Sequence, residues 1–391
     1  MQLIQEFEQY PPIDQIFALV HDREDAVFLD SSMTNQLGRF SIIGLNPYLK
    51  LVKGEAFTIN GTISEESYEV WVKNYLKSHQ EENRTGLPLT SGAIGYFSYD
   101  YGRKKERVAS RHPREVDIPD SILVFYDNFI IENHAQHRLY LVANSHGQDA
   151  AAAMDEMKGL LERAEKNPSA AASFAKTDSP VLPAFTANFA KQDYMDAVQR
   201  MIQYIVEGDI YIANMTQQLQ IASPVKPFEM FQRLRVNNPS PFGGYFNYGD
   251  FQVVSASPER FLQMQKGRIQ TRPIKGTRKR GSTPEEDAAL KAELEQSGKD
   301  KSELLMIVDL ERNDLNRVCI PGSVKVTELF SVETYATVFH LISNVIGTLR
   351  PELTVMDLLE AAFPGGSITG APKLRAMELI DYLGLSARAS H

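Results

Sequence analysis

Short runs of β-branched and aromatic residues alternate with turn residues through the first 145 positions. Such runs predict strands, because these side chains pack well on a pleated surface. The predicted strands are Ala26–Leu29, Phe40–Ile43, Tyr48–Val52, Ala93–Tyr99, Ile122–Ile131 and Leu139–Val142. Tyr68–Lys77 is the clearest predicted helix in this part of the chain.

The spacing of apolar residues becomes helical between residues 147 and 167, as shown by Met154, Met157, Leu160 and Leu161. A stretch rich in Ala, Ser and Pro follows and reaches Phe185, which is a composition typical of linkers. We therefore divide the chain into a region at residues 1–145, a helix and linker at 146–184, and a second region at 185–391.

The second region predicts helices separated by strands, which gives an α+β fold class. One amphipathic helix should begin with Asp193 as its cap and end at Gly208. Its apolar face contains Tyr194, Val198, Ile202 and Ile205. The segment Thr283-Pro284-Glu285-Glu286 predicts a capped helix start, with the helix ending near Gly298 and another beginning near Lys301. Strands are expected within Ile210–Ile221 and Gln252–Ser255.

Composition narrows the class of protein. The 391 residues are 43% hydrophobic and carry a formal net charge of −9, which disfavours nucleic acid or an anionic membrane as the main partner. Cys319 is the single cysteine, so a disulfide framework is excluded and a reducing cytoplasm is expected. We expect no signal peptide, and no apolar run reaches the ~18 residues that a membrane span requires.

A basic segment from Arg272 to Gly281 contains a candidate nucleophile. The sequence places Lys275 in a glycine turn after a strand that ends at Pro273. Neighbouring cations and partial burial both lower the pKa of an amine, which makes its lone pair available at neutral pH. The alternative, which composition alone favours, is a solvated basic turn.

Asp300 and Glu303 are three residues apart, so a helix would place both carboxylates on one face. Mg²⁺ prefers oxygen ligands and keeps several waters, so two carboxylates can form half of its site. The alternative is a solvated acidic helix start, where carboxylates interact favourably with the helix dipole. Without further context, this second interpretation is favoured.

A glycine-rich loop from Phe363 to Lys373 precedes a predicted helix. Backbone N–H groups in such a loop can bind an anion. Ala371 stands where a nucleotide phosphate loop requires lysine, which excludes that class of site. A carboxylate-binding loop and a plain tight turn both stay open. His340 lies alone in an apolar run, where a hydrogen-bonded core histidine is commoner than a catalytic one.

Five motifs, in this order and combination, resemble the chorismate-binding enzymes. They are SASPERF (255–261), RPIKGTRKRG (272–281), ELLMIVDLERNDL (303–315), VFHLISNVIG (338–347) and GGSITGAPK (365–373). That family includes component I of anthranilate synthase and of aminodeoxychorismate synthase, and the isochorismate and salicylate synthases. The segments FLDSS (28–32), GRFSIIGLNP (38–47), GAIGYFSYD (92–100) and IPD (118–120) resemble the amino-terminal region of the first two. The resemblance implies a two-layer β-sandwich flanked by helices.

The resemblance also implies roles for individual residues. Lys275 stands where anthranilate synthases typically have alanine, and a lysine there is the aminodeoxychorismate synthase signature. This lysine would attack C2 of chorismate as the 4-hydroxyl leaves, and ammonia would then add at C4. Glu259 matches the acid/base residue, and Glu303 with Asp300 matches the Mg²⁺ site. The positions that match substrate contacts are Thr277, His340, Ser367, Thr369 and Gly370.

The implied activity is amination of chorismate to 4-amino-4-deoxychorismate, for 4-aminobenzoate and folate biosynthesis. A separate glutamine amidotransferase subunit would supply the ammonia, because this chain has no cysteine-nucleophile glutaminase motif. Anthranilate synthase component I is the alternative activity. Ser31, Pro239 and Ser240 match a region that binds tryptophan in anthranilate synthases, with a hydrophobic core corner as the alternative.

The sequence departs from the family at two places. Ile212 stands where relatives usually have Gln or Lys, and that lysine activates a water in isochorismate and salicylate synthases, so these two activities are disfavoured. The family also continues past the helix after GGSITGAPK with residues that complete the Mg²⁺ site and the sheet. We therefore expect a fold incomplete at its C-terminus and negligible turnover by this chain alone. An inactive remnant that binds a ligand or partner is the alternative to an enzyme.

Overall fold

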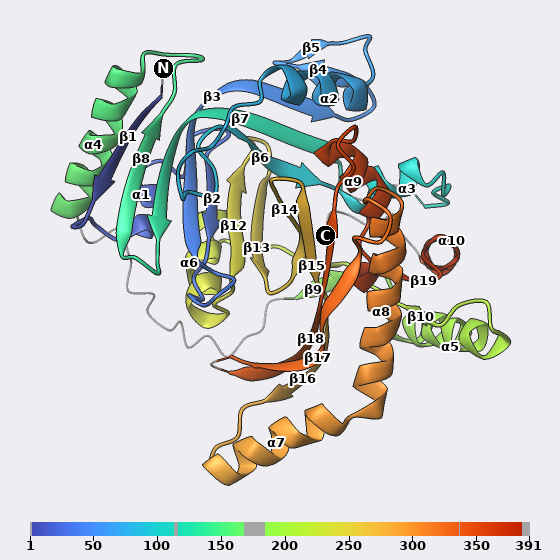
Figure 1. The fold of residues 1–391 in the computed structure, drawn as a ribbon. Helices are drawn as coiled ribbons and strands as arrows, with labels where there is room; N and C mark the ends of the chain where they lie inside the picture. Colours follow the sequence, from blue (N-terminus) through green and yellow to red (C-terminus); the bar gives the residue numbers. More distant parts are fainter. Residues whose placement is uncertain (1, 113–115, 168–183, 336, 385–391) are drawn as a thin grey trace. The chain divides into compact units, whose positions relative to one another are not determined.

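The computed structural model describes residues 2–112, 116–167, 184–335 and 337–384 (Figure 1). The chain forms two compact units, each assembled from separate stretches of sequence. Unit 1 contains Met1–Tyr96, Pro119–Ala184 and Ile221–Pro258, and unit 2 contains Phe97–Ile118, Phe185–Gln220 and Glu259–His391. The sequence analysis expected a helix and linker at 146–184 between two continuous regions. In the structure, each unit instead consists of three stretches that alternate along the chain. The linker residues 168–183 lie outside the described part of the chain.

A ten-stranded sheet is the main element described in unit 1. Its strands follow the order β1-β8-β7-β3-β2-β12-β13, with β4 beside β3, β5 beside β4 and β6 beside β7. Neighbours along the main path are antiparallel. The strands are β1 Leu3–Phe7, β2 Val27–Asp30, β3 Phe40–Lys53, β4 Phe57–Ile59, β5 Thr62–Ile63, β6 Gly92–Phe97, β7 Ser121–Asn133, β8 Arg138–Ala143, β12 Phe242–Asn247 and β13 Gln252–Ser257.

The strands predicted in the first region are confirmed, but two of the predicted strands form a single continuous strand in the structure. Phe40–Ile43 and Tyr48–Val52 both lie in β3, which pairs with β7 along its whole length. The residues between these two segments do not end the strand. Asn46 has a left-handed φ of 55°, and the pairing with β7 shifts register after Pro47. A bulge absorbs the extra residue and preserves the pairing.

The strand predicted at Gln252–Ser255 in the second region is confirmed as β13, but it belongs to the sheet of unit 1, together with β12, which was not predicted. Strand β12 pairs with β2, which places Gly243 opposite Asp30 and Phe246 opposite Val27. Pairing between strands so distant in sequence leaves no local pattern from which to predict it. This pairing brings the segment after Pro227 back to the amino-terminal strands.

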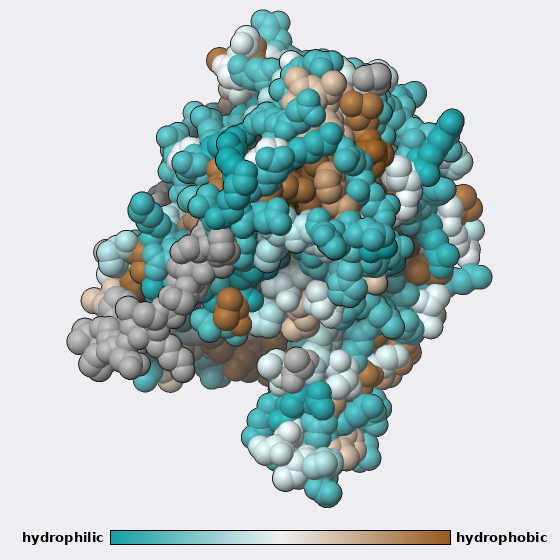
Figure 2. Space-filling model, turned by 90° about the vertical axis from the view of Figure 1, so that its left-hand side faces the viewer, coloured by the Kyte–Doolittle hydropathy of each residue, from teal (hydrophilic) through white to brown (hydrophobic). Residues whose placement is uncertain are grey.

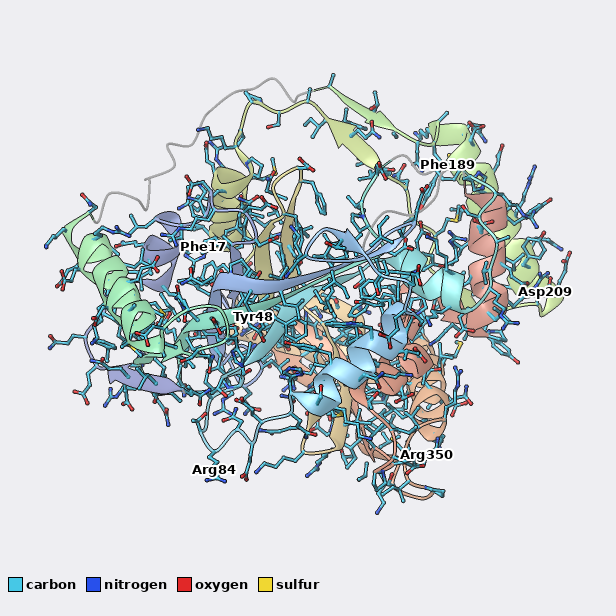
Figure 3. The ribbon with its side chains drawn as sticks, turned by 90° about the horizontal axis from the view of Figure 1, so that it is seen from above. Phe17, Tyr48, Arg84, Phe189, Asp209 and Arg350 are labelled. Carbon is cyan, nitrogen blue, oxygen red and sulfur yellow. The ribbon has the colours of Figure 1, made fainter. Side chains whose placement is uncertain are left out.

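Helices α1 Ile13–Ala18, α4 Ala150–Lys166 and α6 Pro227–Asn237 pack beside this sheet (Figure 1). The ring of Phe17, labelled in Figure 3, lies 5.1 Å from that of Phe28 and 5.7 Å from those of Phe228 and Tyr245. The apolar face predicted for α4 is buried in the same cluster. Helix α2 Tyr68–Ser78 confirms the other predicted helix of this region.

In unit 2, β18 Val338–Thr348 is the central strand of a five-stranded sheet. One edge of β18 pairs with β17 Lys325–Thr334 and the other with β15 Arg268–Arg272 and then β16 Ile274–Lys279, while β14 Arg260–Gln265 lies beside β15. The pairings of this sheet are antiparallel.

Helices α7 Pro284–Gln296 and α8 Gly298–Asn316 pack against this sheet, and Leu304 and Val308 of α8 share a buried cluster with Leu341 of β18. Thr283 caps α7 as predicted. Helix α8 begins earlier than expected, because the hydroxyl of Ser297 accepts a hydrogen bond from the backbone N–H of Asp300 at 3.2 Å.

The remaining elements of unit 2 surround a smaller core between α5 Lys191–Glu207 and α10 Lys373–Leu383. Gly208 ends α5 with a left-handed φ of 84°, as predicted, but Asp193 lies within the first turn and Ala190 precedes the helix, so the predicted cap is wrong. The predicted strand Ile210–Ile221 is present only as two short pieces, because the chain pairs with two different partners. The other elements are α3 Tyr99–Lys105, β9 Phe185–Ala187, β10 Ile212–Ala213, β11 Leu219–Ile221, α9 Val355–Ala362, the 3₁₀ turn Gly366–Ile368 and β19 Gly370–Ala371.

The two antiparallel sheets with their helices confirm the α+β fold class. The face drawn in Figure 2 is mainly hydrophilic, with hydrophobic side chains gathered in separate places. None of the helices in the described ranges has the length and apolar character of a membrane span.

Candidate active site

Three residues named from the sequence meet at the start of β16. The Oε1 atom of Glu259 accepts hydrogen bonds from Ser367 Oγ at 2.8 Å and from the backbone N–H of Ile274 at 3.2 Å. The Nζ atom of Lys275 donates to the backbone oxygen of Ser367 at 3.4 Å. Ser367 therefore contacts the predicted acid through its side chain and the predicted nucleophile through its backbone.

The backbone around Lys275 is a bulged strand, so the predicted simple glycine turn is wrong. Strand β16 pairs Ile274 with Ile342 and Thr277 with His340, and the register shifts between these pairs. Gly276 supplies the required left-handed φ of 80°, which other residues avoid. A bulge re-aims side chains relative to a regular strand, and here it directs Lys275 toward Ser367.

The other cations of this basic segment are paired. Arg278 contacts Glu293 at 2.7 Å and Asp300 at 3.1 Å, and Arg280 contacts Asp287 at 2.7 Å. In the part of the chain that the structure describes, no carboxylate lies within ion-pair distance of Lys275 Nζ, whose hydrogen-bond acceptor is a carbonyl. The segment is therefore not a uniformly solvated basic turn.

Burial has a clear effect on Glu259. It raises the pKa of this carboxyl, while hydrogen bonds from Ser367 and Ile274 and the charge of Lys275 act in the opposite direction. A carboxyl with a raised pKa keeps its proton closer to neutral pH, where it can serve as a general acid. The environment of Glu259 thus suits the role that the resemblance implied.

A cavity of about 270 Å³ lies beside these residues. Its lining includes Lys275, Ser367, Thr369 and Gly370, with Ile212 to Met215 from the other side. Thr369 is fully buried, and its hydroxyl donates to the backbone oxygen of Gly365 at 3.0 Å, which fixes the glycine loop. At Gly370 an added Cβ would lie 2.2 Å from the backbone oxygen of Ile212, so only glycine fits. The loop is thus built around a cavity and is more than a plain turn.

Thr277 and His340 face each other across β16 and β18, with 2.9 Å between Thr277 Oγ1 and His340 Nδ1. Burial lowers the pKa of the His340 imidazole, partly offset by Glu333 and the Gly276 backbone, so the neutral ring is favoured. Neither residue is among those that line the 270 Å³ cavity. A hydrogen-bonded histidine and a substrate contact both fit this position.

Asp300 and Glu303 lie on one face of α8, as predicted. The Asp300 carboxylate pairs with Arg278 at 3.1 Å, and Glu303, whose side chain is 34% exposed, lies 3.9 Å from Lys299. No group of three or more acidic, histidine or cysteine residues suited to a metal occurs in the described ranges. The two carboxylates fit half of a Mg²⁺ site, since this ion accepts one or two protein carboxylates with waters and substrate oxygens.

The region matched to a tryptophan pocket lies in unit 1. Ser31 Oγ donates to the backbone oxygens of Phe40 at 2.8 Å and Pro241 at 2.9 Å, and Ser240 is buried beside Ser32, whose Oγ accepts from its backbone N–H at 3.0 Å. Pro239 precedes this contact in the chain. The structure brings these residues together as predicted, and the binding of tryptophan stays a prediction.

The sequence analysis missed a buried polar cluster on the inner face of α8. Glu311 Oε2 accepts a hydrogen bond from Thr271 Oγ1 at 3.0 Å, and burial raises the pKa of this carboxyl to about 8. Lys373 Nζ donates to Asp314 Oδ2 at 2.6 Å and to the backbone oxygen of Ala362 at 2.9 Å. A signal was present, because Glu311 follows Val308 at helical spacing and therefore shares the buried face of α8.

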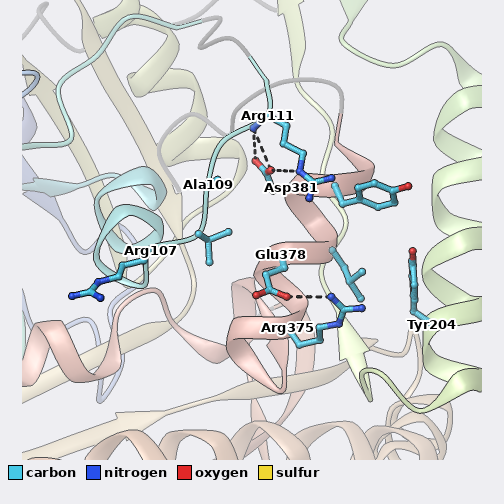
Figure 4. Close-up of a pocket in the computed structure, with 10 residues that line it drawn as sticks. Arg107, Ala109, Arg111, Tyr204, Arg375, Glu378 and Asp381 are labelled. Atoms are coloured by element: carbon cyan, nitrogen blue, oxygen red, sulfur yellow. Dashed lines mark hydrogen bonds and ion pairs between the residues drawn. The ribbon is translucent and has the colours of Figure 1, made fainter.

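A larger cavity of about 500 Å³ lies between α5, α10 and residues 107–111 (Figure 4). Two of its arginines have acidic partners: Arg375 contacts Glu378 at 3.1 Å, and the backbone N–H of Arg111 donates to Asp381 at 3.3 Å. None of the residues singled out from the sequence lines it. We therefore place the candidate site in the smaller cavity, which is lined by the candidate nucleophile Lys275 and by Ser367, the hydrogen-bond donor to Glu259.

Comparisons with known proteins identify the family of this chain. The family described as chorismate binding enzyme matches residues 25–390. Aminodeoxychorismate synthase component 1 of Bacillus subtilis is 34% identical over 96% of this chain and 81% of its own length. Anthranilate synthase component 1 of Pseudomonas putida is also 34% identical, over 94% of this chain and 78% of its own length.

The crystal structure of anthranilate synthase component I from Streptococcus pneumoniae is 28% identical and superposes with a TM-score of 0.77, covering 92% of this chain and 80% of that one. The two relatives compared above have different activities and the same identity to this chain, 34%. This chain belongs to the chorismate-binding enzymes.

Proposed function

We propose that chorismate binds in the 270 Å³ cavity and that Lys275 and Glu259 serve its amination at C4 to 4-amino-4-deoxychorismate, a reaction for which this chain alone is expected to show negligible turnover. One observation carries the proposal: Ser367, which lines the cavity with Lys275, contacts Lys275 at 3.4 Å and Glu259 at 2.8 Å, so one serine joins a nucleophile at the cavity wall to an acid behind it. Such a pair serves covalent catalysis with general acid assistance.

The proposed reaction has two balanced halves. The neutral amine of Lys275 forms a bond to C2 of the ring, the double bonds shift, and the C4–oxygen bond breaks as Glu259 protonates the departing hydroxyl, which leaves as water. Ammonia then forms a bond to C4, the double bonds shift back, and the C2–nitrogen bond to Lys275 breaks. The Glu259 carboxylate recovers the proton that the added ammonia releases. The net change consumes one ammonia and releases one water.

Mg²⁺ is part of the proposal through Glu303, with Asp300 beside it on the same face of α8. When bound, the ion would supply positive charge for the ring carboxylate of chorismate. Arg278 already pairs with Asp300, so Glu303 is the carboxylate better able to reach a metal. We also propose that ammonia comes from a glutamine amidotransferase subunit, in keeping with relatives named as component 1 of an enzyme.

Anthranilate synthase component I is the second candidate activity, because the relative with this name from Pseudomonas putida is 34% identical to this chain, as is the aminodeoxychorismate synthase component 1 of Bacillus subtilis. Lys275 favours amination at C4, since its side chain reaches the same serine as the acid. An alanine at this position could not form the covalent bond.

The test is to incubate the chain with chorismate in the absence of ammonia and to measure the mass of the peptide that contains residue 275. We expect a mass increase of chorismate minus water at Lys275 and none in Lys275→Ala. Lys279→Ala is the matched control, because this neighbouring lysine has a 75% exposed side chain and should leave the adduct unchanged.

Ammonium salt and Mg²⁺ are then added, and any product is identified by its mass as aminodeoxychorismate or anthranilate. An unmodified Lys275 at saturating chorismate would reject the covalent route. Chorismate binding without any adduct would instead support the remnant that only binds a ligand.

A further inference from the structure

We propose that Asn214 is a positioning residue for Lys275: its side-chain amide holds the Ser367 carbonyl so that the Lys275 amine is directed at the cavity. The inference rests on the proposed function, since it concerns how the proposed nucleophile is placed. Asn214 was not singled out from the sequence, and it lies directly after the short strand β10.

The contacts of Asn214 with the glycine loop are the first argument. Its backbone N–H donates to the Thr369 oxygen at 2.8 Å, and its Nδ2 donates to the Ser367 oxygen at 3.2 Å. The same Ser367 oxygen accepts from Lys275 Nζ at 3.4 Å. A carbonyl oxygen has two lone pairs, so it can accept from both nitrogen atoms.

The loop is fixed on the same side by backbone pairing. Strand β10 pairs with β19, with Ile212 opposite Ala371 and Ala213 opposite Gly370. Ser367 lies just before β19, in a 3₁₀ turn that this pairing does not reach. The Asn214 side chain extends the contact to Ser367, whose hydroxyl in turn reaches Glu259 at 2.8 Å. Without the amide, the Ser367 peptide would lose the neutral donor that orients its carbonyl.

The charge of the side chain is the second argument. Ile212, Ala213 and Met215, which line the cavity from the same segment, are apolar, so Asn214 is the polar side chain that this segment contributes. An amide adds no charge beside Lys275, which already interacts with the carboxyl of Glu259. A carboxylate in place of the amide would favour the ammonium form of Lys275 and remove the lone pair that the reaction needs.

The test measures the titration of Lys275 without chorismate, by trace labelling with acetic anhydride from pH 6 to 11 and mass spectrometry of the peptide. In Asn214→Asp we expect the midpoint for Lys275 to rise by about one pH unit, a tenfold loss of neutral amine, as for a nearby opposite charge. Gln217→Glu is the matched control, because it adds the same charge at an exposed residue outside the cavity lining and should not move the midpoint.

A second arm compares the rate of chorismate adduct formation. Asn214→Ala should leave the Lys275 midpoint unchanged and slow the adduct about tenfold, because misplacement of a reacting group lowers the rate without changing its acidity. Equal midpoints in Asn214→Asp and the unchanged protein, or an unchanged adduct rate in Asn214→Ala, would overturn the inference. A raised midpoint in Asn214→Asp with no adduct in the unchanged protein would instead reject the proposed function and keep the Asn214 contact.

Discussion

Asp30 in unit 1 and Glu311 in unit 2 are both buried carboxyl groups, but their hydrogen-bond partners differ. In unit 1, the Asp30 side chain is 1% exposed and accepts hydrogen bonds from Arg235 at 2.9 Å and 3.3 Å. In unit 2, Glu311 is buried against the neutral hydroxyl of Thr271, and no cation lies within ion-pair distance of it among the described residues. Glu259 likewise accepts hydrogen bonds from a hydroxyl and a backbone N–H.

This difference separates structural charges from chemically useful ones. A buried carboxylate with a bidentate arginine has a charged partner and serves the packing of its unit, whereas a buried carboxyl with neutral donors keeps its proton more readily. Asp314 is intermediate: Lys373 contacts it at 2.6 Å, yet burial raises its pKa to about 6. Burial also raises the pKa of Asp25 in unit 1, which pairs with Lys50, whereas Glu259, Glu311 and Asp314 lie in unit 2, the unit of the cavity that contains Lys275. Perturbed groups beside a cavity are what a catalytic site requires.

The largest expected effect is that of Glu259→Gln, which keeps the shape of the side chain and removes its proton. We expect the rate of adduct formation at Lys275 to fall about 10²–10⁴-fold, the usual contribution of a general acid. The free energy of unfolding should not fall, because an incompletely compensated buried carboxyl is removed. Rapid-quench mass spectrometry and urea unfolding measure the two quantities. A rate within twofold of the unchanged protein would show that Glu259 is as structural as Asp30.

Breaking the charge pair of unit 1 should give the opposite profile. Arg235→Ala leaves Asp30 buried without its cation and also removes the 3.0 Å contact with Asp14. The expected loss is about 3–5 kcal/mol of unfolding free energy, measured by urea unfolding at pH 7. The double variant Asp30→Asn with Arg235→Met is the control and should recover most of the loss. A loss below about 1 kcal/mol in Arg235→Ala would contradict a structural role for this pair.

Glu311→Gln should change the pH dependence of stability. The pKa of Glu311 rises from 4.5 to about 8 on folding, so the folded state binds more protons than the unfolded state between these values. The stabilisation is complete below pH 4.5 and is lost as the pH rises to about 8. At about 1.4 kcal/mol per pH unit, the loss is on the order of a few kcal/mol.

Glutamine cannot ionise and can still accept from Thr271, so it should flatten this slope and stabilise the protein at pH 9. Urea unfolding from pH 4 to 9 tests the expectation. Parallel stability curves for the two proteins would show that Glu311 is ionised throughout.

Local sequence patterns predicted the elements with their own caps or periodicity. The capped start of α7 at Thr283 and the apolar face of α4 are confirmed, because both depend on residues within one or two helical turns. The pairing of β12 with β2 could not be predicted, since it depends on contacts between distant segments. The sequence alone does not show whether Phe40–Lys53 forms one strand or two, because its continuity depends on pairing with β7.

The candidate site shows the same limit. The family motifs place Lys275, Glu259 and Ser367 in three separate segments of the sequence. In the structure, Lys275 and Glu259 both contact Ser367. The roles of Asn214 and Lys373 had no local signal, because each depends on which loop or helix folds beside it. Glu311 did have a signal, because it is a charged residue at helical spacing from the buried Leu304, Ile307 and Val308, and burial explains its raised pKa.

The smallest expected effect is on the packing around Asp300. This carboxylate contacts Arg278 at 3.1 Å, so it is intermediate between Asp30, which has a bidentate arginine, and Glu311, which has a neutral donor. Gly276 has a φ of 80°, and an added Cβ would lie 2.8 Å from the Cβ of Asp300. Gly267 is a matched control in the same sheet, with a φ of 75° and no atom within 4 Å of an added Cβ. Gly267→Ala should therefore cost about 1–2 kcal/mol from left-handed backbone strain alone.

Gly276→Ala should cost about 1 kcal/mol more, because the methyl group also overpacks against Asp300. If displacement of Asp300 frees Arg278 from its carboxylate, that arginine should become more reactive to phenylglyoxal in Gly276→Ala and not in Gly267→Ala. If the two variants lose the same unfolding free energy and their Arg278 is labelled equally, the Asp300 side chain moves away from the added methyl group without losing its contact with Arg278. The Asp300 carboxylate could then also move enough to bind a metal ion, whereas the Asp30 carboxylate is held in place by Arg235.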